Sequence, residues 1–145
     1  MFEKLFLLVK NNAGEAVINN PAIAENNREA VLNDASSSII EVLKSQMESG
    51  KIKDFVTYFQ FTGIYSNPLI SKAVNKFANK LNNYYNMDAK QAMETSKALI
   101  PPVMQELIKQ SKGEQNKEFA LRAILTKLGG GIGDMTLLLN QLKIA

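Results

Sequence analysis

The amino-acid sequence predicts an all-α protein, a single helical domain of six to eight helices. Apolar residues recur at every third or fourth position, alternating apolar and polar runs are hard to find, and Pro, Gly or Asn stand where the apolar pattern breaks. A chain of 145 residues with 46% hydrophobic and 21% charged residues has the size and composition of an ordinary globular domain. We therefore expect one domain over residues 1–145, divisible into an N-terminal half (1–65) and a C-terminal half (66–145).

The first helix is predicted over residues 2–17 and ends before Pro21, because a residue that precedes proline is disfavoured in helical geometry. Its core-facing stripe consists of Phe2, Leu5, Phe6, Val9, Ala13, Ala16 and Val17. Leu7 and Leu8 fall outside this stripe and are separated from each other by about 100° on the helical wheel. Either another helix of the same chain covers these two leucines, or they form an interface with a second protein molecule.

Two more helices are predicted before residue 66. The second helix begins near Asn26 or Asn27 and ends at Gly50, since glycine commonly terminates helices. Its apolar side holds Val31, Ala35, Ile39, Val42 and Met47. A shorter third element, residues 52–61, stops at Gly63.

The fourth helix, residues 68–85, is predicted to be strongly amphipathic. Asn67 is expected to cap it, and Pro68 suits the first helical position, where a missing amide costs nothing. The apolar side consists of Ile70, Ala73, Val74, Phe77, Ala78, Leu81, Tyr84 and Tyr85. We interpret the two tyrosines as core or edge residues, because both belong to the apolar side; the alternative is stacking on nucleic-acid bases.

The opposite side of this helix carries Lys72, Lys76 and Lys80 among asparagines, and the sequence has no acidic residue between Asp54 and Asp88. Such a pattern is typical of a solvated helix face. The alternative is a positive surface that contacts the phosphates of a nucleic acid.

The fifth helix is predicted to begin after Asp88, which forms a capping-box pattern with Gln91. It then meets Pro101-Pro102, two residues that lack backbone donors and clash with the preceding turn, so we expect the helix to be kinked or split there. A structural kink is the simpler interpretation. The alternative is a binding groove at the kink.

The glycine-rich run, residues 129–133, follows a predicted helix over 119–128. It lacks the Gly-Lys-Ser/Thr sequence of a phosphate-binding loop, and Thr136 stands where a dinucleotide-binding motif has its third glycine. Both of these motifs also follow a β-strand, whereas this run follows a predicted helix. We interpret the run as a flexible linker.

A short final helix is predicted after Asp134, with Met135, Leu138, Leu139 and Leu142 on one side. Leu137 and Ile144 lie off that stripe. They are therefore candidates either to cover Leu7 and Leu8 or to join them in an interface.

The composition argues against most catalytic and metal sites. The chain has no Cys and no His, which removes the usual ligands of zinc, copper and haem as well as a catalytic triad or a cysteine nucleophile. No pair of carboxylates and no calcium-loop pattern stands out. We therefore expect no cofactor, no metal and no enzymatic activity.

Net charge and hydropathy bear on the possible partners of the protein and on its cellular location. The net charge of +3 allows nucleic-acid binding without indicating it. The apolar run over residues 5–9 is too short for a signal peptide, and no segment approaches the ~20 apolar residues of a membrane span. The sequence thus predicts a cytoplasmic protein.

One segment resembles a known family. Asn86-Met87-Asp88-Ala89, followed by Ala92, then Leu99-Ile100-Pro101-Pro102-Val103-Met104 and Leu107, is similar to the core of the bacterial YidB-like families of unknown function, and the glycine-rich tail is similar too. The resemblance covers residues 66–145. It implies a small helical bacterial domain with a helix-turn-helix-like arrangement and no established activity, and it supplies no catalytic residues.

The sequence therefore predicts a non-enzymatic bacterial protein that acts through self-association or through binding another protein. The alternative function is weak nucleic-acid binding through Lys72, Lys76 and Lys80.

Overall fold

The computed structural model describes residues 2–48 and 67–112, and every regular element in these two ranges is a helix. The elements are α1 (Phe2–Asn11), a π-helical turn (Gly14–Ile18), a short 3-10 helix (Glu25–Asn27), α2 (Arg28–Glu48), α4 (Pro68–Tyr84) and α5 (Ala89–Lys112). The all-α prediction is confirmed for this part of the chain. The helices predicted over 52–61, over 119–128 and after Asp134 lie outside it, so the number of six to eight helices stays a prediction.

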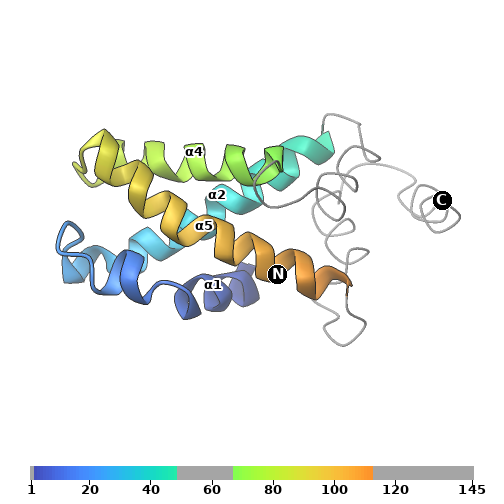
Figure 1. The fold of residues 1–145 in the computed structure, drawn as a ribbon, viewed down its shortest axis with the longest axis horizontal. Coiled ribbons are helices and arrows are strands. Elements are labelled where there is room, and N and C mark those ends of the chain that lie inside the picture. Colours follow the sequence, from blue (N-terminus) through green and yellow to red (C-terminus); the bar gives the residue numbers. More distant parts are fainter. Residues whose placement is uncertain (1, 49–66, 113–145) are drawn as a thin grey trace, which may run out of the picture.

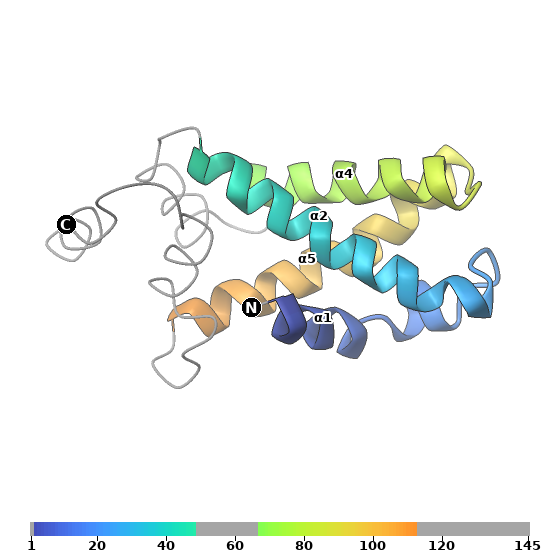
Figure 2. The same ribbon diagram turned by 180° about the vertical axis from the view of Figure 1, so that it is seen from behind.

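The α-helices of the described ranges enclose one hydrophobic core. Figures 1 and 2 show α2 and α5 crossing on opposite faces of the molecule, with α4 along one edge and α1 along the other. α4 packs against α5 and α2, and α1 packs against α2 and α5. The largest fully buried side chains come from all of these helices: Leu5, Ile39, Leu43, Leu69, Phe77, Leu81, Leu99, Ile100 and Met104.

The first predicted helix is interrupted. Its α-helical part ends at Asn11, and the Asn12 side-chain amide donates to the Leu8 carbonyl at 2.8 Å, so a side chain replaces part of the main-chain pairing. The chain then continues as the π-helical turn, in which Ile18 donates to the Ala13 carbonyl at 3.0 Å. Leu5, Val9, Ala13, Ala16 and Val17 of the predicted stripe are buried and Phe6 is partly buried, although the helix is not continuous.

Of the two alternatives for Leu7 and Leu8, coverage by other helices of the same chain holds for Leu8. Leu8 is 9% exposed and belongs to the hydrophobic core, whereas Leu7 is 51% exposed. The physical reason is that α1 packs against two neighbours, α2 and α5, so a wider arc of its surface is buried than a one-sided stripe predicts.

The interpretation of the two tyrosines holds for one of them. Tyr84 is the last residue of α4 and is 69% exposed, because the chain leaves the core at this point. Asn86 then takes a left-handed backbone conformation, with φ of 57°, and reverses the chain, and the buried Met87 donates from its amide to the Leu81 carbonyl. Tyr85 is partly buried against the core, and its hydroxyl donates a hydrogen bond to the Asp34 carboxylate of α2.

α5 is one helix and is not split at the two prolines, which lie inside it. Asp88 caps its first turn by accepting a hydrogen bond from the Lys90 amide at 2.8 Å. Residues on both sides of the prolines are fully buried, among them Ile100 and Val103. Burial of these side chains offsets the helical hydrogen bonds that the prolines cannot make.

Among the helices of the described ranges, none combines the length and the apolar composition that crossing a membrane requires.

Candidate functional site

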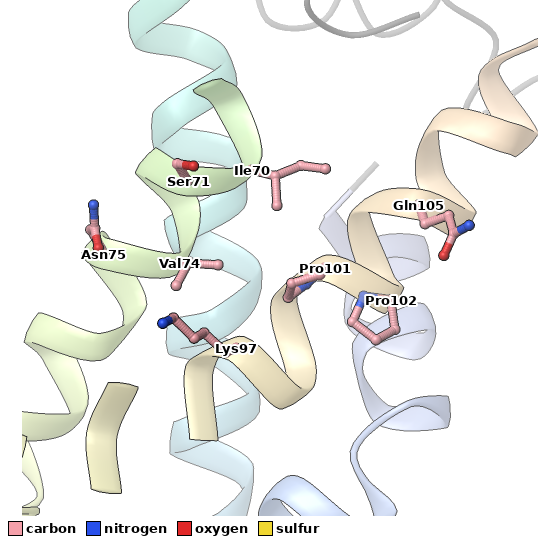
Figure 3. Close-up of a pocket in the computed structure, with 8 residues that line it drawn as sticks. All are labelled: Ile70, Ser71, Val74, Asn75, Lys97, Pro101, Pro102 and Gln105. Carbon is pink, nitrogen blue, oxygen red and sulfur yellow. The ribbon is translucent and has the colours of Figure 1, made fainter. Parts of the chain in front are cut away.

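The candidate site is a groove between α4 and α5 with a volume of about 590 Å³ (Figure 3). α4 and α5 lie close together near the turn that joins them and diverge along their length (Figure 1). The groove is lined from α4 by Ile70, Ser71, Val74 and Asn75, and from α5 by Lys97, Pro101, Pro102 and Gln105. The alternative interpretation of the prolines, a groove beside them, thus corresponds to a real hollow in the structure.

A buried hydrogen bond holds the two helices together beside the groove. Ser96 of α5 donates from its hydroxyl to the Val74 carbonyl of α4 at 2.6 Å. A serine at this position is small enough to let the two backbones approach closely. The prolines occupy the neighbouring turn of α5, and their short rings do not fill the space between the diverging helices.

The groove has an apolar floor and a polar rim. Ile70 and Val74 are buried and point from α4 toward α5, and Pro101 is partly buried opposite them (Figure 3). The polar rim consists of Ser71, Asn75 and Gln105, all exposed, together with Lys97, the one lining residue with a charged side chain; the exposed ring of Pro102 lies among them. An apolar surface bordered by hydrogen-bonding groups is the usual composition of a binding site.

The prolines also change the main chain of the groove wall. In an α-helix the amides of residues 101 and 102 would donate to the carbonyls of Lys97 and Ala98, but proline has no amide hydrogen. Those two carbonyls are therefore left without their usual α-helical donors.

A second hollow, of about 450 Å³, lies between α2 and α4 and includes two of the three predicted lysines, Lys72 and Lys76. The lysine face is not uniformly positive, because Glu41 of α2 lies against it. Its carboxylate is 3.4 Å from the Lys76 amine and 3.2 Å from the Lys80 amine, and the Lys80 side chain is only 15% exposed. Lys76 and Lys80 therefore share one acidic partner, Glu41.

The lysine pattern could not reveal Glu41, which lies 39 residues before Lys80 in the sequence and on another helix. The Lys80 amine also donates to the Ser37 hydroxyl at 3.3 Å, so this lysine is tied to α2 at two points. The single Glu41 carboxylate offsets one of the two positive charges of Lys76 and Lys80, which weakens the case for phosphate contacts at this face. In the described ranges no three acidic, His or Cys side chains gather as a metal site would require.

The candidate interface residues do not form a shared surface in the part of the chain that the structure describes. Leu7 is exposed on α1, Leu8 is in the core, and Leu137 and Ile144 lie outside the described residues. The candidate interface on α1 is therefore restricted to Leu7.

Comparison of the chain with protein-family models, curated proteins and solved structures gave no match. The resemblance to the YidB-like families has no support from these comparisons and stays a prediction. The function must therefore be argued from the groove and from the charges around it.

Proposed function

We propose that this chain is a non-enzymatic helical binding protein that holds a short extended segment of another protein in the α4–α5 groove. The observation that carries the proposal is the groove itself, an apolar floor bordered by polar side chains at the two prolines of α5. The proposal keeps protein binding as the function and places it at the groove.

The polar side chains that line the groove favour a peptide segment. A peptide carries a main-chain carbonyl acceptor at each residue and an amide donor at each residue other than proline. The side chains of Asn75 and Gln105 can both donate and accept, so they can pair with the carbonyls and amides of the same segment.

The shape of the groove also favours a segment of chain over an enclosed small molecule. Small-molecule sites commonly bury most of the ligand surface, whereas this groove lies open along the surface between two helices (Figure 3). Peptide recognition in surface grooves rests on a few side-chain anchors together with main-chain hydrogen bonds. Ile70 and Val74 provide the apolar surface on which an anchor side chain can pack.

The experiment that tests the proposal is selection of binders from a displayed library of random peptides against the purified protein. Asn75→Trp places a large side chain at the groove. Because Asn75 also lines the hollow between α2 and α4, the control is Asn79→Trp, which makes the same change at an exposed position of α4 that lines only that second hollow. We expect selected peptides to bind the wild type and the Asn79→Trp variant and to lose binding to Asn75→Trp. Peptides that bind all three proteins equally, or a selection that yields no binder, would overturn the proposal.

A further inference from the structure

We infer that the segment held in the α4–α5 groove carries a carboxylate next to an apolar side chain, and that Lys97 pairs with the carboxylate. This inference rests on the proposed function, since it specifies the chemistry of the segment bound in the same groove.

Lys97 has no acidic partner among the residues that line the groove. Among the eight lining residues it is the one charged side chain, and none of the eight is acidic. Within the described ranges no ion pair involves Lys97, in contrast to Lys76 and Lys80, which share Glu41. Glu94, one turn earlier on α5, is exposed and does not line the groove. An anionic group in the groove is therefore the partner that complements this charge.

The α4 side of the groove carries positive charge. α4 has no acidic residue, and its first turn, which includes Ile70 and Ser71 of the groove, is the positive end of the helix dipole. Lys72, on the outer face of α4, adds a further positive charge close to Asn75, since both line the second hollow. The field over this surface disfavours a basic segment and favours an acidic one.

Lys97 and the apolar side chain of Val74 face each other from the two helices that form the groove. Figure 3 shows the Lys97 side chain reaching from α5 toward α4, while Val74 points from α4 toward α5. A segment across the groove thus meets the charged amine and the apolar floor together. A carboxylate with a neighbouring apolar side chain satisfies both. The carboxylate can belong to an Asp or Glu side chain or to the C-terminus of the segment.

The test uses a peptide from the selection described above whose binding is lost in Asn75→Trp. It is synthesised in four forms: unchanged, with its acidic side chains replaced by amides, with an amidated C-terminus, and with both changes. If the inference is correct, one of the two single changes lowers affinity for the wild type by roughly three- to tenfold, and that change identifies the source of the carboxylate.

Lys97→Gln is expected to lower the affinity of the unchanged peptide by a similar factor, and the charge-removing peptide change should then have little further effect. Lys97→Glu is expected to reduce binding more. Lys109→Gln is the matched control, because Lys109 is exposed on α5 and does not line the groove.

Failure of this inference can be told apart from failure of the proposed function. Peptides that need the open groove but bind the wild type and Lys97→Gln equally would overturn the inference and leave the proposed function standing. If no selected peptide is sensitive to Asn75→Trp, both are wrong.

Discussion

Ser96 of α5 donates a hydrogen bond from its hydroxyl to the main-chain carbonyl of Val74 on α4, and both residues are buried. Val74 lines the groove, and so does Lys97, the residue that follows Ser96. The bond therefore fixes the distance between the two helices where the groove begins.

We predict that Ser96→Ala lowers the free energy of unfolding by about 1 kcal/mol, the usual net value of one buried hydrogen bond. Ser45→Ala, at an exposed position of α2, is the matched control, because it gives the same gain in helix propensity without removing a buried hydroxyl. Denaturant unfolding of both variants measures the difference. Equal stability of the two variants would show that the bond does not hold α4 and α5 together.

Leu7 and Leu8 are adjacent in sequence but differ in environment, so the same substitution should change the stability of the protein differently at the two positions. Leu8→Glu buries a carboxylate in the core and is expected to destabilise the protein by several kcal/mol, whereas Leu7→Glu should change stability by less than about 0.5 kcal/mol. Thermal unfolding measures both. A Leu8→Glu protein as stable as Leu7→Glu would contradict the packing of α1.

Light scattering on Leu7→Glu tests the remaining interface prediction. A single exposed leucine is common on protein surfaces, so we expect the mass in solution to equal that of the wild type. A decrease in mass would instead assign self-association to α1.

The sequence was sufficient to predict the elements whose signals are local. The cap at Asn67, the buried face of α4 and the start of α5 after Asp88 depend on residues within one or two turns of each other. The hollow beside Pro101 corresponds to the alternative interpretation of the proline pair, whereas a structural kink was the preferred one. The α4 side of this hollow could not be predicted, because no feature of the sequence places Ser71 and Asn75 beside α5.

The features that the sequence left open or that were predicted wrongly depend on contacts between distant segments. Leu8 is buried because α1 has two neighbouring helices, and a helical wheel shows one helix alone. Tyr84 continues the apolar pattern of α4 but lies where the chain leaves the core. The partner of Lys76 and Lys80 comes from α2, and no spacing within α4 indicates it.

The Tyr85 hydroxyl has a pKa raised well above its usual value, first by burial and then by the hydrogen bond and negative charge of Asp34. The folded protein therefore holds this proton more tightly than the unfolded chain does. Its contribution to stability is complete below about pH 10, the ordinary pKa of tyrosine, and is lost progressively as the pH rises toward the folded-state pKa.

We predict that the wild type melts at a higher temperature than Tyr85→Phe at neutral pH, and that this difference narrows above about pH 10. The other tyrosines are present in both proteins and cancel in the comparison. Thermal unfolding across the alkaline range measures the effect. A difference that stays constant throughout that range would contradict the Tyr85–Asp34 contact.

Glu41 is predicted to suppress binding of nucleic acid by pairing with Lys76 and Lys80. Glu41→Gln should raise affinity for duplex DNA and steepen its salt dependence by about 0.9 for each additional phosphate that the lysines neutralise. Glu29→Gln, an exposed position of α2 with the same change in charge, should have a much smaller effect. Equal salt slopes for the two variants would show that Glu41 does not control the lysine face.

The most direct test of the groove as the binding site is hydrogen exchange of the protein with and without a selected peptide. We expect slower exchange on binding to be confined to α4 around residues 70–75 and to α5 around residues 97–105, with no change in α1. Slower exchange in α1 alone, or at the lysine face that contacts Glu41, would contradict the assignment of the groove as the binding site.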